Sequence, residues 1–278
     1  MKESEFYSEL KRRFEALLAE RGLLGEAVSL RAKSLTPEEA IGITKRQDYP
    51  ILTGRDVMVQ AECGGCLGQA FTDAPSAFEG TLGEVCAQDI ENDAHGRGIF
   101  IAALNAVMCR LGILECTVHC RNDGPELCAP MAVERIKAEY GRPRITLIGY
   151  QPSLLAALSQ EFPLRVLDLN PKNIGQTRSG VVVEDGGDEA MRLETCSWAE
   201  LILCTGSTVC NGSIVNFLGY DKVLYYGPVD KSAIGYSMEL RPMALRVLRR
   251  LTPGCFRVVR SFTIRFRFNA VAERRQCS

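Results

Sequence analysis

Two groups of residues carry side chains that could do chemistry, and both contain cysteine. Cys63 and Cys66 have the C-x-x-C spacing that lets two thiolates bind one metal ion. The segment HCRNDGPELCA, residues 119–129, adds His119, Cys120 and Cys128 as candidate metal ligands. A closed zinc site needs four ligands, and the chain has no second C-x-x-C pair. We therefore predict a reduced thiol pair on a loop beside a pocket and assign no permanent metal site.

Polar residues gather in two glycine- or proline-broken segments of the first half. GQAFTD, residues 68–73, fits neither a helix nor a strand pattern, and HCRNDGPELCA is similarly polar. Such segments carry polar groups that are costly to bury in a core, so both are predicted to line a pocket. The candidate ligand-binding residues there are Gln69, Thr72, Asp73, His119, Cys120 and Glu126. If residues 116–120 form a strand, His119 and Cys120 point to opposite faces and do not act as a pair.

A second set of candidate residues follows from the alternation of strand and helix patterns after Arg144. Strand patterns in RITLIG, LRVLDL, AELILCTG and KVLYYG come with a helix pattern in YQPSLLAALSQEF, which is typical of a Rossmann-like parallel sheet. Ligands of such sheets bind outside the carboxyl ends of the strands. The residues at those ends are Gly149, Tyr150, Gln151, Asp168, Thr205, Gly206 and Asn211.

The type of ligand stays open. Asp168 lies nineteen residues after Gly149, close to the spacing of about 20 residues expected for an acid that binds ribose hydroxyls. However, GYQPSL is not G-x-G-x-x-G, so a dinucleotide is not specifically indicated. Nucleotide-like, pterin-like and S-adenosylmethionine-like molecules all remain candidates. In the alternative interpretation the glycines only form turns and Asp168 caps the following loop.

The elements of the first half must position the cysteine and polar groups. Residues 1–22 are predicted to form an amphipathic helix, and AVSLRAKSL, IGIT and DVMVQAE to form a small antiparallel sheet with a turn at TPEE. Residues 96–112 form a buried helix, followed by a short strand in CTVHC and another helix. We predict an α+β domain at residues 1–141 and a Rossmann-like α/β domain at residues 142–278.

Composition narrows the class of protein. The 278 residues are 46% hydrophobic and 24% charged, and neither a membrane-spanning run nor a signal peptide is found, so a cytoplasmic protein with most of its thiols reduced is predicted. Residues 241–278 hold ten arginines and one glutamate, yet SFTIRFRF alternates as a strand with a basic face. No motif accompanies this charge, so nucleic acid is not an expected partner. The oligomeric state is left open.

The motifs together resemble a known family. The segments GQAFTDAPSAFEGTL, LNAVMCRLG, TVHCRNDGPELCA, ITLIGYQPSLLAAL, VLDLNPKNIG and CTGSTVCNGSI are similar to the heavy-metal chelation family of uncharacterised proteins, common in anaerobic microbes. The resemblance covers about residues 40–227. It implies a first domain like the N-terminal domain of enolase, a Rossmann-like second domain and a small-molecule cleft between them. It also makes Gln69, Thr72, Asp73, His119, Cys120, Glu126 and Cys128 family-motif positions. CGGC and the Arg-rich end depart from the family pattern.

These observations predict a small-molecule-binding protein with an interdomain cleft, acting on or carrying a metal-chelating or heteroaromatic compound. Whether it is an enzyme is left open. One alternative is a non-catalytic protein that handles metal directly with its thiols. Another is an S-adenosylmethionine-dependent transferase, which the glycine turns and Asp168 suggest.

Overall fold

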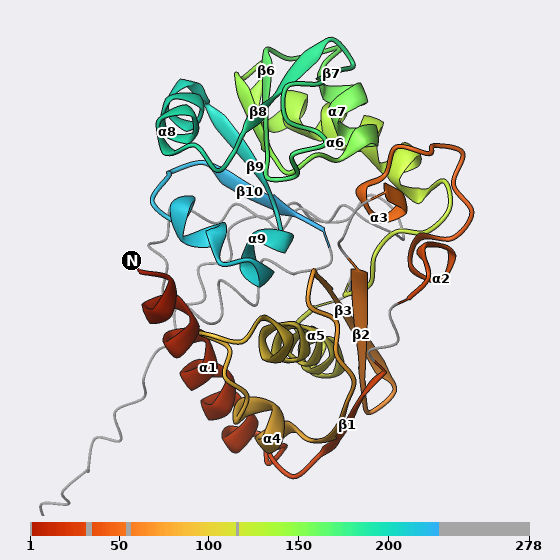
Figure 1. Ribbon diagram of the computed structural model, residues 1–278, viewed down its shortest axis with the longest axis vertical. Coiled ribbons are helices and arrows are strands. Elements are labelled where there is room, and N and C mark those ends of the chain that lie inside the picture. Colours follow the sequence, from red (N-terminus) through yellow and green to blue (C-terminus); the bar gives the residue numbers. More distant parts are fainter. Residues whose placement is uncertain (1, 32–34, 54–56, 115–116, 228–278) are drawn as a thin grey trace, which may run out of the picture.

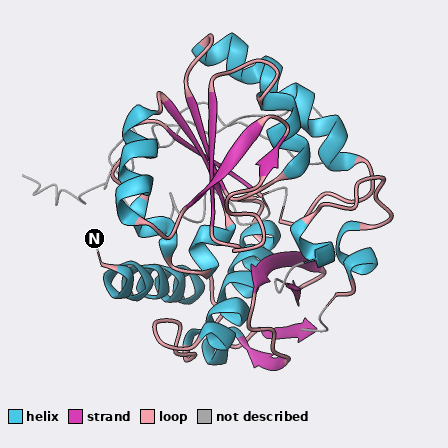
Figure 2. Cartoon of the chain, turned by 45° about the horizontal axis from the view of Figure 1, so that its top comes forward, coloured by secondary structure: helices cyan, strands magenta, loops and turns pink. Residues whose placement is uncertain are grey.

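Two sheets with helices around them make up the described part of the chain. The computed structural model describes residues 2–31, 35–53, 57–114 and 117–227. One sheet has four strands in the order β3-β2-β1-β4, and the other has six in the order β10-β9-β5-β6-β8-β7 (Figures 1 and 2). The predicted fold class, a mixed α/β protein with a small antiparallel and a larger parallel sheet, is confirmed. The strand predicted in SFTIRFRF lies outside the described residues.

The first sheet and its helices occupy the lower part of Figure 1. All of its strand pairs are antiparallel. Its strands are β1 (Ala27–Arg31), β2 (Val57–Cys63), β3 (Cys66–Thr72) and β4 (Phe78–Thr81). The helices within residues 1–141 are α1 (Glu3–Glu20), α2 (Pro37–Ile41), α3 (Pro50–Thr53), α4 (Leu82–Cys86), α5 (Ala94–Arg110) and α6 (Gly124–Tyr140). Of these, α6 packs with the second sheet and lies in the upper part of Figure 1. None of the described helices combines the length and apolar character that crossing a membrane demands.

The C-x-x-C motif forms a tight β-hairpin. Cys63 ends β2, Cys66 begins β3, and the two residues pair across the ladder. Gly64 and Gly65 have φ values of +56° and +78°, as a type I′ turn requires of both central residues. The two thiols are free, as predicted, but their place beside a pocket was wrong. The hairpin lies at the opposite end of β3 from Thr72, about 20 Å away at ~3.3 Å per residue.

Three further local predictions are corrected. TPEE, predicted as a turn, begins α2, because Thr36 and Glu39 form a capping box there, and IGIT is not a strand. GQAFTD, predicted to be irregular, belongs to β3 up to Thr72, paired along β2. Residues 117–120, the described part of the predicted strand in CTVHC, are not in a strand. The argument that His119 and Cys120 must face opposite ways therefore does not apply.

The second sheet carries the parallel strands. Its strands are β5 (Ile145–Ile148), β6 (Leu164–Asp168), β7 (Thr177–Arg178), β8 (Val181–Asp185), β9 (Leu201–Thr205) and β10 (Val223–Tyr226), with helices α7 (Pro152–Leu158), α8 (Glu189–Trp198), α9 (Ser207–Cys210) and the 3-10 turn η1 (Ser213–Asn216). Every neighbouring pair is parallel except β7 with β8. The chain leaves β5 toward β6 on one side and returns to β9 on the other, so the order reverses between β5 and β9. That reversal is where doubly wound sheets bind ligands.

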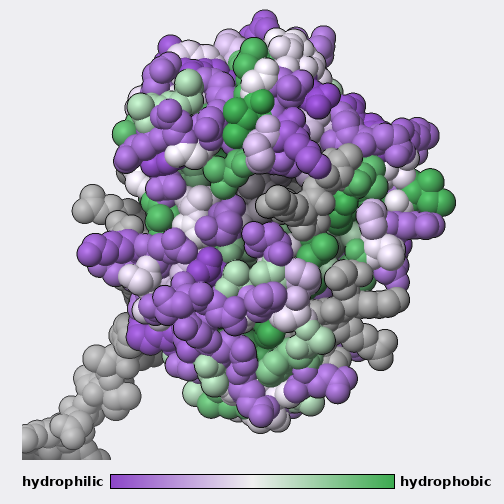
Figure 3. Space-filling view, viewed as in Figure 1, coloured by the Kyte–Doolittle hydropathy of each residue, from purple (hydrophilic) through white to green (hydrophobic). Residues whose placement is uncertain are grey.

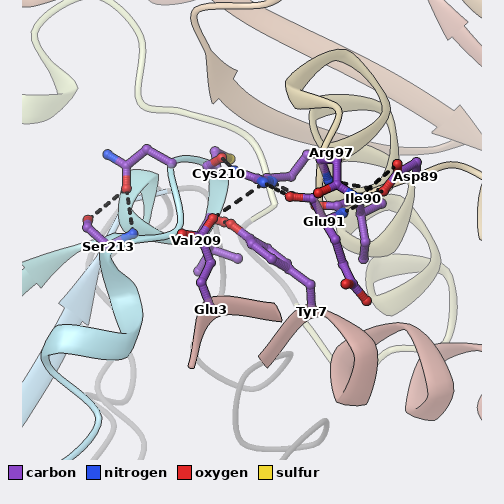
Figure 4. A network of polar contacts seen from close by, with 11 residues as sticks. Glu3, Tyr7, Asp89, Ile90, Glu91, Arg97, Val209, Cys210 and Ser213 are labelled. Atoms are coloured by element: carbon purple, nitrogen blue, oxygen red, sulfur yellow. Dashed lines mark hydrogen bonds and ion pairs between the residues drawn. The ribbon is translucent and has the colours of Figure 1, made fainter. Parts of the chain in front are cut away.

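A buried arginine joins α5 to the carboxyl ends of the second sheet. Arg97, 8% exposed, donates hydrogen bonds to the carbonyl oxygens of Ile90, Glu91 and Cys210 at 2.8, 2.8 and 3.2 Å (Figure 4). Its guanidinium carbon lies 4.2 Å from the centre of the Tyr7 ring. The Tyr7 hydroxyl in turn donates to the carbonyl of Val209 at 2.6 Å. The helices of the first half are thereby attached to α9, and one hydrophobic cluster runs from α1 and α5 to the second sheet.

Glycine allows the first sheet to approach α5 closely. A Cβ atom on Gly68 of β3 would lie 2.1 Å from the amide nitrogen of Ala106 and 2.4 Å from the carbonyl oxygen of Ala102. Both are backbone atoms of α5, which cannot move aside as the end of a side chain can. The strand that ends at Thr72 is therefore positioned by backbone contact with the helix.

We expect Gly68→Ala to lower the free energy of unfolding by about 2–3 kcal/mol or more, because the methyl group must push α5 away from the sheet. Urea unfolding followed by circular dichroism measures this. Gly25→Ala is the matched control, since its Cβ meets no atom within 4 Å and its φ is not positive. Equal stability of the two variants would contradict the close packing of β3 on α5.

Candidate functional site

One large cavity lies where the carboxyl ends of the parallel strands face the first sheet. Its volume is about 570 Å³. Ten of the sequence-predicted residues line it: Thr72, Asp73, His119, Cys120, Gly149, Tyr150, Gln151, Asp168, Thr205 and Asn211. In the space-filling view hydrophobic side chains reach the surface between the upper and lower parts of the molecule (Figure 3).

The first wall of the cavity consists of strand ends. Residues that follow or end β5, β6, β8, β9 and β10 all line it. At the centre, Gly149 has a φ of +88°, and a Cβ there would lie 2.7 Å from Cγ2 of Thr205. The Tyr226 hydroxyl donates toward the carbonyl oxygens of Ile148 and Gly149 at 2.9 and 2.8 Å. The backbone at the reversal between β5 and β9 is thus tightly held.

The second wall comes from the first half of the chain. Phe71, Thr72 and Asp73 contribute the end of β3, and residues 118–120 and 49–51 complete the wall. Two tyrosines connect this wall to the first. Tyr150 donates to Asp48 at 3.0 Å, and Tyr49 lies 2.6 Å from the hydroxyl of Ser153. Burial raises the pKa of Tyr150 to about 12, so its hydroxyl keeps the proton that it donates.

Asp168 organises the strand ends around itself. One carboxylate oxygen accepts from the backbone N–H of Tyr150 at 2.7 Å. The other accepts from the backbone N–H of Asn170 at 2.8 Å and from the side-chain amide of Asn173 at 3.1 Å. Asp168 therefore caps its own loop and also holds the turn after β5. A carboxylate has about four acceptor positions, so a ligand hydroxyl could add to these contacts.

The beginning of α7 has few donors left for an anion. Pro152 has no N–H, and the N–H groups of Leu154 and Leu155 donate to the side chain and the backbone carbonyl of Gln151. Gln151 therefore already accepts from N–H groups that an anion could otherwise bind at this helix.

His119 is held as a neutral imidazole. Its Nδ1 lies 2.7 Å from the carbonyl oxygen of Cys120, so Nδ1 must carry the proton and Nε2 has an available lone pair. Its backbone N–H donates to the side chain of Gln69 at 2.7 Å, and its ring meets Phe71 edge-on. Burial lowers the pKa of His119, which favours the neutral form.

Several predicted residues do not line the cavity. Gln69 and Glu126 lie behind it, where they bond to His119 and Tyr49, and the N–H of Gly206 bonds to the carbonyl of Tyr226. Cys120 does line the cavity but is in a disulfide bond, which corrects the prediction that the thiols are reduced at this position. The other metal candidates, Cys63, Cys66 and Cys128, lie off the cavity. Within the described ranges no three His, Cys, Asp or Glu side chains are arranged to share a metal ion.

Some lining residues escaped sequence reasoning. Tyr49 and Arg192 come from segments that carry no motif, and Asn170 belongs to a loop behind Asp168. Tyr226 could have been found, because it is the last residue of the strand predicted in KVLYYG. The strand β8, whose end contributes Gly186, was not predicted.

The lowered pKa of His119 predicts a pH effect on stability. Below pH ~6.5, His119 becomes protonated in the unfolded chain but stays neutral in the folded protein, because its folded pKa is lower. The free energy of unfolding therefore falls as the pH decreases from about 6.5 toward the folded pKa. We expect the decrease between pH 7.5 and 5.5 to be smaller in His119→Gln than in the wild type, measured by urea unfolding. His95→Gln removes the other, exposed histidine and serves as the control. Parallel profiles for wild type and His119→Gln would contradict the buried neutral imidazole.

Comparison with family models and with curated protein sequences gives no match. Among solved structures, the chain is similar to a protein of unknown function from the DUF364 family of Pyrococcus horikoshii, with 14% identity, a TM-score of 0.48 and coverage of 84% of this chain and 81% of that chain. It is also similar to a DUF364 protein of unknown function from Desulfitobacterium hafniense DCB-2, with 11% identity, a TM-score of 0.42 and coverage of 66% and 72%. Likeness at this level assigns no activity and no ligand. The resemblance to a heavy-metal chelation family rests on the sequence motifs alone.

Proposed function

We propose that the protein binds a small heteroaromatic, nucleoside-like molecule in the cavity between the two sheets. The observation that carries this proposal is the position of the cavity at the reversal between β5 and β9, with strand ends on one wall and the end of β3 on the other. Doubly wound sheets bind ligands at that reversal. On this proposal residues 1–141 and 142–278 act as two domains that contribute one wall each.

The size and lining of the cavity support a flat, partly apolar ligand. A volume of about 570 Å³ lies within the range of roughly 300–1,000 Å³ that is usual for small-molecule sites. Aromatic rings and aliphatic side chains from both walls line it, including Tyr49, Phe71, Ile148 and Leu167. Rings of this kind stack on heterocycles at little entropic cost.

Acceptor groups on the second wall suit the donor edge of a heterocycle. The neutral His119 lines the cavity and has an available lone pair on Nε2, and the exposed carboxylate of Asp73 has no hydrogen bond to any described residue. An exocyclic amine or a ring N–H would satisfy both. On the first wall, Asp168 stands at the end of the second parallel strand, where ribose hydroxyls bind in doubly wound folds.

The turn after β5 disfavours a ligand with a pyrophosphate at that point. Dinucleotide sites place a pyrophosphate on free helix N–H groups behind a glycine-rich turn. Here the helix α7 begins with Pro152 and is capped by Gln151. We therefore favour a nucleoside, a pterin or a similar heterocycle over a dinucleotide.

The role of the bound molecule follows from the motif resemblance. A protein of the heavy-metal chelation family would make, modify or carry a metal-chelating heteroaromatic compound, and the cavity offers room for one. S-adenosylmethionine is a second candidate, supported by the strand order and by the position of Asp168. Direct metal handling by thiols is supported less well, because Cys63 and Cys66 lie off the cavity and Cys120 is in a disulfide.

Calorimetry with adenosine, S-adenosylmethionine, a pterin and NAD tests the proposal. We expect at least one of the first three to bind and NAD to bind no better than adenosine. Asp73→Asn should weaken binding about 10- to 100-fold, the loss of one hydrogen bond to a charged group. Glu62→Gln is the control, because Glu62 is an exposed carboxylate of the same sheet away from the cavity.

Two results would contradict the assignment. In one, none of the four compounds binds the wild type. In the other, a compound binds but Asp73→Asn and Glu62→Gln leave its affinity equally unchanged, which would place the ligand elsewhere. Tight binding of NAD alone would favour a dinucleotide site. It would refute the claim that the start of α7 disfavours a pyrophosphate.

A further inference from the structure

Arg192 is an unusual side chain in the cavity wall. It belongs to α8 and lines the cavity near the ends of β6 and β8, where Asp168 and Gly186 also line it. Only 15% of its side chain is exposed. Its one ion pair with a described residue is with Glu189 at 3.8 Å, and the Glu189 side chain is 78% exposed. A charge taken out of water normally needs close, hydrogen-bonded partners.

Two other arginines with little exposure have close hydrogen-bond partners. Arg165, 21% exposed, donates to Glu184 and Glu194 at 2.8 Å each. Arg97 donates to three carbonyl oxygens. By contrast, no hydrogen bond joins the Arg192 guanidinium to a residue in the described ranges. The contrast indicates that its partner is not supplied by this part of the chain.

Apart from the exposed Glu189, the described groups around Arg192 do not compensate its charge. Its field acts on Cys196 and Tyr220, and burial raises the pKa of each, so both are neutral at pH 7. The two carboxylates that line the cavity, Asp73 and Asp168, form no ion pair with it. The positive charge therefore remains available to whatever occupies the cavity.

Two amides add donors to the same cavity. Asn170 accepts from the N–H of Lys172 through its side-chain oxygen at 3.0 Å, and Asn211 accepts from both N–H and hydroxyl of Ser213 at 3.0 and 2.7 Å. With their oxygens engaged in this way, both residues have NH₂ groups left to donate. Asn170 and Asn211 both line the cavity. The wall of strand ends is thus rich in donors, whereas the wall with Asp73 and His119 is rich in acceptors.

We propose that the ligand carries an anionic oxygen group, a carboxylate or a phosphate monoester, and that Arg192 binds it. This inference rests on the proposed function, because it names the chemistry of one end of the molecule in that cavity. The planar guanidinium can bind either group through two parallel hydrogen bonds. The donor-rich wall then binds the anionic end and the acceptor-rich wall the heterocycle.

The first test needs no ligand. Arg192→Met removes the charge and keeps the apolar stem, and we expect an unchanged or higher melting temperature in the ligand-free protein, since the largely buried charge has only one long ion pair, at 3.8 Å, to lose. Glu189→Gln is the matched control on the same helix. If the Arg192–Glu189 ion pair stabilised the fold, both variants would melt several degrees lower than the wild type, by similar amounts. That result would overturn the inference.

The second test compares matched ligands. Calorimetry would use adenosine, its 2′-, 3′- and 5′-monophosphates, adenosine-5′-carboxylic acid and the neutral 5′-carboxamide. We expect at least one anionic compound to bind the wild type ten-fold or more tighter than adenosine, and this ratio of affinities to fall to about one in Arg192→Met, with both compounds measured on each variant. A gain with the phosphates only, or with the carboxylate only, identifies which anionic group is used.

The outcomes separate this inference from the proposed function. If adenosine binds but every anionic compound binds no tighter, or if Arg192→Met keeps the gain, the anion assignment is wrong and the heterocycle site stands. If adenosine does not bind, inorganic phosphate alone is the probe. A rise in melting temperature with phosphate in the wild type but not in Arg192→Met would support the anion site and refute the nucleoside. No rise would refute both.

Discussion

The contact of Arg97 with α9 is the constraint on which the site depends. A buried guanidinium must have its donors satisfied, and Arg97 donates to carbonyl oxygens of the segment before α5, at Ile90 and Glu91, and to that of Cys210 at the end of α9. Tyr7 lies against the guanidinium and donates to the carbonyl of Val209, so α1 is also attached to α9. This contact fixes how the first sheet stands over the strand ends. The separation of the two cavity walls follows from it, because β3 rests directly on α5 through Gly68.

The polar residues of the cavity fall into two groups. One group forms hydrogen bonds that hold the cavity walls, and the other has polar atoms left to bind a ligand. The side-chain oxygens of Asp168 and Gln151 accept hydrogen bonds from nearby backbone N–H groups, so these two residues shape the strand ends. His119 and Asp73 keep acceptors available, and Arg192 has no partner closer than 3.8 Å among the described residues. A cavity with acceptors on one wall, donors on the other and apolar rings between them matches an elongated heteroaromatic molecule with an anionic end.

Sequence periodicity was enough for the parallel strands β5, β6, β9 and β10 and for their ends, which meet at the cavity, but it missed β8. Strand ends converge by topology, so Gly149, Asp168 and Thr205 could be brought together without coordinates. Local patterns failed where tertiary contacts decide. GQAFTD is a strand because Gly68 lets it lie on α5, and Arg192 reaches the cavity from a helix without a motif. The β-hairpin at Gly64 and Gly65 was not predicted, although two glycines between paired residues are typical of a type I′ turn.

The central claim is that the space between the strand ends and the end of β3 is a ligand site. Crystal structures of the wild type soaked with adenosine, S-adenosylmethionine and a pterin at saturating concentration test it most directly. The account predicts ordered electron density for a heterocycle between Asp73, His119 and the turn at Gly149, with any anionic group directed toward Arg192. Density for water alone with all three compounds, or the same compounds bound only outside the cavity, would contradict it.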